Sequence, residues 1–209
     1  MAHEAAVLKA REIAGSVLAP SAAQNDAAGR FSTEAVQSLG EYGLLGLLLP
    51  VEVGGAGLGP HTFAAVTATL AEADASVGMV YVMHVLGAAS IAAARSDATG
   101  PTMPILREIA AGRHLSTLAF SEAGSRSHFW APISRARRNG NGVTTSAKKS
   151  WVTSAGQAQS YVVSALAPEG AGPTDSTLYL VSAGTRGLSV AGPWNGLGLR
   201  ASICTHCSG

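Results

Sequence analysis

Through the first half of the chain, apolar residues recur at intervals of three and four, which predicts helices packed by one face. Ser32 or Thr33 can cap one of these helices, with Glu34 in its first turn and Gly43 at its end. We expect helices over residues 3–20, 32–43, 61–73, 77–94 and 104–111. Pro20 is expected to end the first, because proline interrupts helical hydrogen bonding.

The spacing of apolar residues along the chain changes near residue 115. Short runs rich in β-branched residues then follow one another, separated by turn residues, which predicts strands. The sequence Asn-Gly-Asn-Gly at 139–142 is the strongest hairpin signal in the chain. We expect strands within residues 114–120, 133–138, 142–147, 160–167, 177–183 and 187–192.

The fold class expected from this change is α+β. An all-α helical bundle domain, residues 1–114, precedes a small antiparallel β-barrel or β-sandwich domain, residues 115–209. Clefts between such units are common binding sites. The stretch AFSEAGSRSHFWA, residues 119–131, lies at the seam, and its small, hydroxyl and aromatic residues are typical of a loop that holds a ligand.

Composition and charge exclude several classes of protein. Only 13% of residues are charged and 47% are apolar, which argues against a disordered chain. The net charge of +1 gives no basic field for nucleic acid or an anionic membrane surface. Many glycines and alanines suggest close helix packing. The glycine-rich VEVGGAGLGP, residues 51–60, fits neither a dinucleotide nor a P-loop spacing and is interpreted as a surface loop.

Residues 76–94 carry no formal charge over a length that could span a bilayer. Small and polar residues within the segment, and the absence of a basic cluster beside it, favour a buried helix and no membrane span. His84 in this helix is interpreted as a core histidine with its hydrogen bonds satisfied. Cys204 and Cys207 lack a second pair of metal ligands, so we expect no metal site, and the cysteine usage fits the cytoplasm.

Three stretches of the β half are considered together because of their order and spacing along the chain: LAFSEAGSRS, KKSWVTSAGQAQSYVV and GLGLRAS. Together with residues 18–59 of the helical half, they resemble the acyl-CoA dehydrogenase family of flavoproteins. The resemblance extends from about residue 4 to about residue 202. It implies FAD as cofactor and an acyl-CoA thioester as substrate.

By this resemblance, residues 118–127 form the loop that lies along FAD, with Leu118, Phe120 and Gly124 among the cofactor-binding residues. Ser121 stands where a hydroxyl bonds the pyrimidine edge of the flavin. Ser127 stands where a serine meets the flavin phosphates and the acyl-CoA. Such contacts are physically reasonable, because a buried polar edge needs donors and a diphosphate needs N–H groups and hydroxyls.

The resemblance also matches Trp151, Val152 and Thr153 to a second flavin-binding motif. There the tryptophan packs on the ring system and the threonine hydroxyl approaches the reactive ring nitrogen. A flat, apolar ring needs such an aromatic wall. Plainer interpretations stay open: Trp151 as a barrel-core residue, and Ser121, Ser127 and Thr153 as ordinary turn or strand hydroxyls.

The loop departs from the family pattern at three positions. Ala123 replaces the usual proline, Arg126 a glycine and His128 an acidic residue. Arg126 can pair with a phosphate or face solvent, and His128, next to Phe129 and Trp130, can shape the substrate entrance. Arg126, Ser127 and His128 are therefore the candidate substrate-binding residues. The cations of the hairpin region, Arg137, Arg138, Lys148 and Lys149, are interpreted as solvated.

The family reaction removes the α proton of the thioester and passes the β hydrogen to FAD as hydride, and an electron-transfer flavoprotein then takes the electrons. The full-length family forms homo-oligomers. Two alternative functions are compatible with the same fold. One is a flavin-dependent monooxygenase that uses oxygen, and the other is a non-catalytic remnant or an interaction module.

In the resembled family the catalytic base is a carboxylate of a C-terminal helical bundle. No acid here matches that base, and Glu122 belongs to the flavin loop. The cysteine-bearing tail CTHCSG, residues 204–209, departs from the alternating strand expected after GLGLRAS. A shifted reading frame or a premature stop would produce this change, and a short natural terminus is the alternative. We therefore expect a truncated family member with weak or no FAD retention, self-association and no dehydrogenation by the isolated chain.

Overall fold

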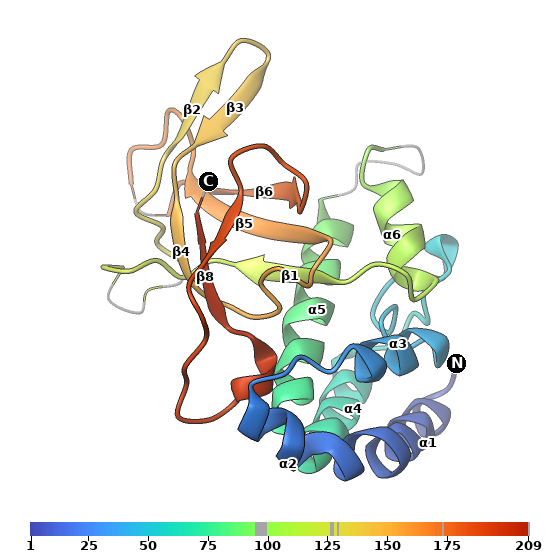
Figure 1. Ribbon diagram of the computed structural model, residues 1–209. Coiled ribbons are helices and arrows are strands. Elements are labelled where there is room, and N and C mark those ends of the chain that lie inside the picture. Colours follow the sequence, from blue (N-terminus) through green and yellow to red (C-terminus); the bar gives the residue numbers. More distant parts are fainter. Residues whose placement is uncertain (95–99, 126–127, 129, 173, 209) are drawn as a thin grey trace.

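A helical half is followed by a β half, as the sequence predicts (Figure 1). The computed structural model describes residues 1–94, 100–125, 128, 130–172 and 174–208. The α-helices are α1 (His3–Ile13), α2 (Ala19–Ala28), α3 (Thr33–Glu41), α4 (Pro60–Ala73), α5 (Ala75–Ala93) and α6 (Met103–Ala110). The other helical turns are η1 (Ala14–Leu18), η2 (Val51–Val53) and η3 (Arg200–Ser202). The strands are β1 (Ser116–Ala119), β2 (Ala136–Asn139), β3 (Gly142–Thr145), β4 (Lys148–Val152), β5 (Ser160–Leu166), β6 (Ser176–Ser182), β7 (Ser189–Ala191) and β8 (Thr205–Ser208).

The first helix does not end at Pro20, so that prediction was wrong. The π-helical turn η1, in which hydrogen bonds span one residue more, leads directly into α2. Pro20 lies in the first turn of α2, immediately after this π-helical turn. The helical path continues to Gly29, whose φ of +58° ends it in the left-handed region.

The predicted boundaries of α3 are confirmed by its contacts. The Oγ of Ser32 accepts a hydrogen bond from the N–H of Ala35 at 3.3 Å, as an N-cap side chain does. Gly43, with φ of +72°, follows the end of the helix. The glycine-rich residues after η2 form a loop before α4, as expected.

Helix α5 is the central element of the molecule and contacts α4, α6, β1 and β5. Ten of its residues are buried, among them Gly78, which packs so closely on Ala71 of α4 that an added Cβ would lie 2.6 Å from the alanine Cβ. This confirms close packing through small residues. By length and composition α5 could cross a membrane. However, 56% of its most apolar stretch is buried inside the protein, which favours a core helix.

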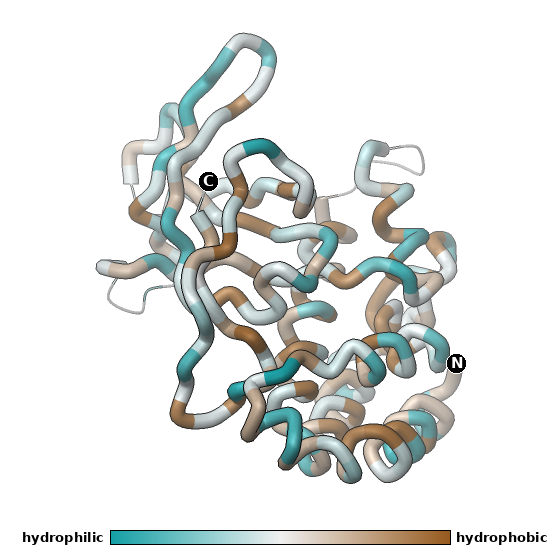
Figure 2. The backbone as a smooth tube through the Cα atoms, in the orientation of Figure 1, coloured by the Kyte–Doolittle hydropathy of each residue, from teal (hydrophilic) through white to brown (hydrophobic). Residues whose placement is uncertain are grey.

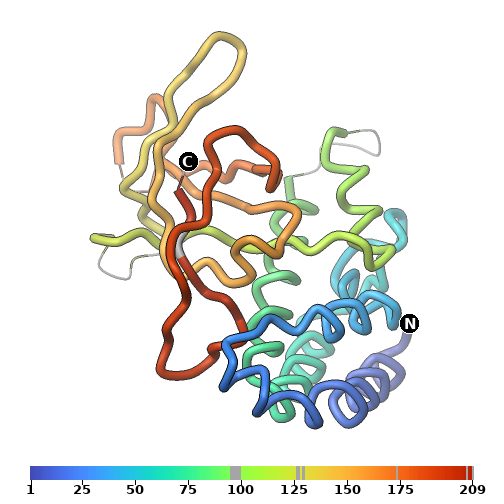
Figure 3. The backbone as a smooth tube through the Cα atoms, in the orientation of Figure 1, coloured from blue at the N-terminus to red at the C-terminus, as the bar shows by residue number. Residues whose placement is uncertain are grey.

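The β half contains two three-stranded sheets and a hairpin (Figure 3). In the order β1-β5-β6, β1 and β5 are parallel and β5 and β6 antiparallel. In the order β4-β8-β7 all pairs are antiparallel. The β2–β3 hairpin turns at Gly140, as predicted, and is mainly hydrophilic (Figure 2).

Two strands were missing from the sequence-based assignment. β4 begins with two lysines and has a register shift between Lys149 and Val152, so its sequence lacks a regular alternation of buried and exposed residues. β8 falls within the tail CTHCSG, yet it is the middle strand of its sheet, between β4 and β7. Cys207 of β8 is 3% exposed and packs into the core of the β half.

The two halves are joined by direct hydrogen bonds and not only by apolar contact. His84 of α5 is fully buried, and its Nδ1 accepts from the N–H of Ser116 in β1 at 3.0 Å. Its Nε2 therefore carries the proton and donates to the carbonyl of Leu45 at 3.1 Å. The predicted core histidine is confirmed. A second link lies at the other end, where the N–H of Arg200 donates to Oδ1 of Asp26 at 2.9 Å and the segment near residue 200 lies beside α2 (Figure 3).

Burial lowers the pKa of His84 from 6.5 to about 4. A group whose pKa is depressed in the folded state stabilises the fold above its unfolded pKa, and that contribution is lost as the pH falls. We expect the free energy of unfolding to fall by about 3 kcal/mol between pH 6.5 and pH 4 from this group. Urea unfolding of the wild type and of His84→Gln across this range measures it.

The variant His61→Gln, at an exposed histidine of α4, is the control and should keep the wild-type pH dependence. A loss of stability that is equal in the wild type and in His84→Gln would contradict the assignment of this pH dependence to His84.

Candidate functional site

A cleft of about 670 Å³ lies between α5 and the β half. One wall is the outer face of α5, and the other is formed by the end of β1, the residues that follow it, and β4. The lining residues are Met83, Leu86, Ala89, Ser90, Ala93, Leu118, Phe120, Ser121 and Trp151. The structure thus brings together four residues that the sequence indicated as cofactor-binding, from two separate motifs.

Trp151 lies on this cleft and is not a core residue. Its side chain is 62% exposed, which excludes the barrel-core interpretation. Its backbone φ is +60°, an uncommon and costly conformation for a bulky residue. The ring of Trp194 packs edge-on against it, with centroids 5.3 Å apart and an interplanar angle of 82°. Trp194 is held in turn by its Nε1–H, which donates to the carbonyl of Leu199 at 2.9 Å.

Ser121 is held on both sides by its neighbours. Its carbonyl accepts from the N–H of Ser150 at 2.8 Å. The Nζ of Lys149 donates to the carbonyl of Phe120 at 3.2 Å and to Oε1 of Glu122 at 2.6 Å. The backbone before and after Ser121 is therefore fixed to β4, which holds this residue at the cleft.

Lys149 was predicted to be a solvated hairpin cation, and that prediction was wrong. Its side chain is 2% exposed, and its Nζ also donates to the carbonyl and the Oγ of Ser164 in β5, at 2.6 and 3.2 Å. Lys149 occupies an inward position of β4 and Lys148, the residue before it, an outward one.

Glu122, the partner of Lys149, has both carboxylate oxygens satisfied. Its Oε2 accepts from the N–H groups of Ile133 and Ser134 at 2.7 and 2.8 Å, and its Oε1 accepts from the Oγ of Ser134 at 2.5 Å. Burial raises the pKa of Glu122, but Lys149 and Ser134 outweigh burial and hold it below its usual value. The carboxylate thus closes the loop between residues 122 and 133 and is not available as a base.

The remaining residues of the second motif lie behind the cleft. Val152 is fully buried in the core of the β half. Thr153 is 2% exposed, and its hydroxyl donates to the Sγ of Cys204 at 3.6 Å. The carbonyl of Thr153 accepts from the Oγ1 of Thr117 in β1 at 2.8 Å, which ties β4 to β1. The structure therefore places the Thr153 hydroxyl beside Cys204 and not among the residues that line the cleft.

Of the candidate loop residues, Arg126 and Ser127 lie outside the described residues. Gly124 is exposed and has φ of +95°, a conformation that favours glycine. His128 is exposed too, and its ring lies against that of Trp130 with centroids 5.0 Å apart.

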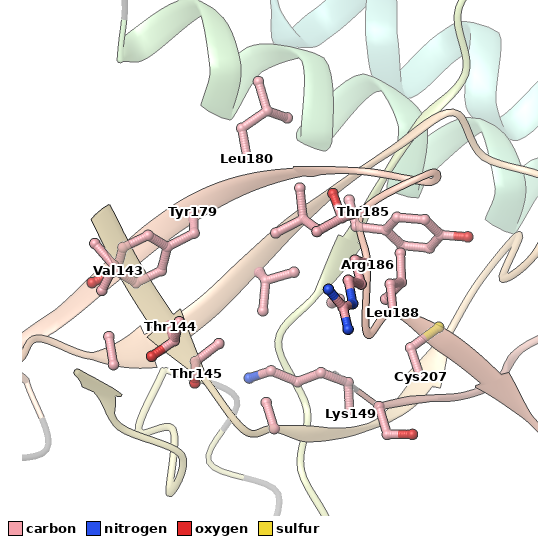
Figure 4. Close-up of a pocket in the computed structure, with 17 residues that line it drawn as sticks. Val143, Thr144, Thr145, Lys149, Tyr179, Leu180, Thr185, Arg186, Leu188 and Cys207 are labelled. Carbon is pink, nitrogen blue, oxygen red and sulfur yellow. The ribbon is translucent and has the colours of Figure 1, made fainter. Parts of the chain in front are cut away.

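A second cavity, of about 410 Å³, lies inside the β half and contains none of the predicted site residues among its described lining (Figure 4). Its walls are mainly apolar side chains of β3, β5 and β6, with Lys149, Arg186 and Cys207 at its border. Burial raises the pKa of Cys207 to about 11, so the thiol stays protonated. No group of three His, Cys, Asp or Glu that could hold a metal occurs among the described residues.

Comparison with known proteins gives consistent matches. The family model of the acyl-CoA dehydrogenase N-terminal domain matches residues 2–100, and that of the middle domain matches residues 117–208. The short/branched chain specific acyl-CoA dehydrogenase of Bos taurus is 31% identical over 194 residues. The amino sugar nitrososynthase RubN8 of Streptomyces rubradiris is 34% identical over 186 residues.

The fold is that of a glutaryl-CoA dehydrogenase from Mycobacterium smegmatis solved in complex with FADH2. The TM-score is 0.85 at 21% identity, over 99% of this chain and 52% of that one. The two curated relatives are covered over 92% and 87% of this chain but only 44% and 43% of their own lengths. The chain therefore spans about half the length of the curated relatives it matches.

The buried Glu122–Lys149 pair should be strongly coupled. We expect Glu122→Gln and Lys149→Met each to lower the free energy of unfolding by about 3–5 kcal/mol, because each leaves a buried charge without its partner. The double variant should cost clearly less than the sum of the two. Chemical denaturation of the four proteins gives the coupling energy.

The exposed pair Arg138–Glu169, with Nε and Oε1 also 2.6 Å apart, is the matched control. Its double-mutant cycle should show no measurable coupling, because water screens both partners. Additive effects at Glu122 and Lys149 would contradict the role given to this pair.

Proposed function

Because the chain belongs to the acyl-CoA dehydrogenase family, we propose that it binds FAD in the cleft beside α5 and places an acyl-CoA thioester there for α,β-dehydrogenation. The observation that carries the proposal is the meeting of Leu118, Phe120, Ser121 and Trp151 on one cleft, opposite the apolar face of α5. These residues come from two motifs about thirty positions apart, so their convergence is a property of the fold.

The residues present suit a flavin. Its ring system is flat and apolar with one polar edge, and it would need an aromatic wall with hydrogen-bonding groups at the rim. Trp151 and Phe120 would supply the wall, and the hydroxyl of Ser121 would meet the polar edge. Bound FAD would accept the hydride from the substrate.

The side chains of α5 would hold the acyl part of the substrate. Met83, Leu86 and Ala89 form an apolar surface, and Ser90 is the polar residue among them. Among the described residues that line the cleft there is no carboxylate, and Glu122 is held by Lys149. We therefore propose that these 209 residues orient cofactor and substrate but do not supply the base that takes the α proton.

The partners proposed with this function are those of the family. An electron-transfer flavoprotein or a similar acceptor would take the electrons, and the full-length family assembles as a homo-oligomer. We propose the cytoplasm as the site of action.

Two variants test the cofactor site. Trp151→Ala and Ser121→Ala should each weaken FAD binding, by about 1–3 kcal/mol, because one removes the aromatic wall and the other a hydrogen bond to a buried edge. Flavin fluorescence titration measures the dissociation constant. Leu8→Ala, at a residue of α1 that is as exposed as Trp151 (61%), is the control and should bind like the wild type. Unchanged affinity in both site variants would rule out this cleft as the flavin site.

A turnover assay tests the division of roles. The purified 209-residue chain, supplied with FAD, an acyl-CoA and an artificial electron acceptor, should show flavin bands but no dehydrogenation above background. Enoyl-CoA formation by this chain alone would refute the proposal that the base lies elsewhere. A colourless protein that does not respond to added FAD would instead favour the non-catalytic remnant.

The second candidate is a flavin-dependent monooxygenase of the same fold. It is favoured by the 34% identity to the amino sugar nitrososynthase, whose name describes oxidation of an amine and not of a thioester. Oxygen consumption in the presence of a flavin reductase and an amino sugar would distinguish it from the dehydrogenase, which needs an electron acceptor other than oxygen.

A further inference from the structure

The β2–β3 hairpin has two faces of different chemistry, which follow from the alternation of side chains along a strand. One face, with Ala136, Val143 and Ala147, lines the apolar cavity inside the β half. The other face lines a separate cleft of about 730 Å³ that ends at Glu122 and Ala123 of the flavin loop. Its lining from the hairpin and the residues beside it is Arg135, Arg137, Thr144, Thr145, Ser146 and Lys148, the first residue of β4. Thr144 and Thr145 also line the apolar cavity.

The cleft carries positive charge that nothing in it neutralises. In the described part of the chain, the side chains of Arg137 and Lys148 make no hydrogen bond or ion pair. Arg135 is fixed at the cleft by its Nη1, which donates to the carbonyl of Gly170 at 2.7 Å and retains its charge. Glu122, the acidic lining residue, is neutralised by Lys149. Three cations thus lie together on a chain whose net charge is only +1.

Besides cations, a phosphate site needs hydrogen-bond donors, and hydroxyl groups provide them here. Thr144 and Ser146 line the same cleft as the three cations, whereas the hydroxyl of Ser134 already donates to Glu122. Cations together with hydroxyl donors are the groups that bind diphosphates. By contrast Arg138, the next residue of β2, points to the opposite face and pairs with Glu169 at 2.6 Å. The free charges are therefore concentrated on one face of the hairpin.

The position of the cleft suggests which diphosphate it receives. Glu122 and Ala123 lie at its inner end, and Ser121, the preceding residue, lines the cleft beside α5. The two clefts are therefore lined by neighbouring residues of one loop, so a ligand that occupies both would extend from Trp151 and Ser121 towards the hairpin.

We propose that the basic face of the β2–β3 hairpin binds the diphosphate of the nucleotide carrier to which the substrate is attached. Arg137 and Lys148 provide the main charges, and Thr144 and Ser146 the hydroxyl donors. This inference rests on the proposed function for the identity of the carrier, a coenzyme A thioester, but the anion site itself does not depend on it.

Binding of inorganic diphosphate to the full 209-residue chain at low salt tests the site. Arg137→Gln and Lys148→Gln should each weaken binding roughly tenfold, as expected for loss of one charge-assisted contact, and rising salt should abolish the difference. Arg138→Gln, one residue away on the other face, is the matched control and should bind like the wild type. Because all three side chains are exposed, thermal melts of the variants should coincide. No binding by the wild type, or equal binding by all four proteins, would overturn the proposal.

Three further ligands identify the carrier. Coenzyme A should bind with the same loss in Arg137→Gln and Lys148→Gln, whereas FAD should bind these variants like the wild type. Weaker binding of FAD, with coenzyme A unaffected, would overturn the assignment to the substrate. If UDP-glucose binds through these residues and coenzyme A does not, the anion site stands and the acyl-CoA substrate of the proposed function fails.

Discussion

The structure depends on the burial of one helix, α5, which packs against α4 on one side and against β1 on another. Towards α4 it presents small residues such as Gly78, and towards β1 it presents Gly87 and His84. At Gly87 an added Cβ would lie 3.4 Å from the backbone of Thr117, so β1 lies directly on the helix. Because β1 leads into the flavin loop, the packing of α5 on β1 sets the width and position of the cleft.

The second determinant of the site is polar. A lysine buried among carbonyl oxygens and one carboxylate contributes little net stability compared with an apolar side chain, because desolvation offsets the attraction. It does, however, specify geometry. Lys149 contacts the residues on both sides of Ser121 as well as β5, so the loop cannot move without breaking several hydrogen bonds. Lys149 thus fixes one side of the cleft by polar contacts, and α5 forms the apolar side. The residues of both sides are distant in sequence.

The sequence predicted most elements and half of the site. The helices other than the first kept their limits within about two residues, because their periodicity and caps are local properties. Trp151, Ser121, Phe120 and Leu118 could be grouped by resemblance to a family. What local pattern could not provide was the environment of a charged residue. Lys149 and Lys148 are identical by residue type, and only the pairing of β4 with β8 and the bridge between Lys149 and Glu122 determine which of them is buried. The same holds for Pro20, where the π-helical turn before it removes the expected break.

The contacts of Lys149 also determine its chemical reactivity. Thioesters acylate amines through the free lone pair of the neutral nitrogen, and a protein that handles thioesters exposes its own lysines to this side reaction. The Nζ of Lys149 is buried and has four oxygen atoms within hydrogen-bonding distance, so a thioester cannot reach it. Burial lowers the pKa of Lys149, and the ion pair with Glu122 opposes that shift. Lys148, one residue earlier and exposed, has no such protection. Burial of Lys149 thus allows an amine to lie next to the proposed substrate path without being acylated by the thioester.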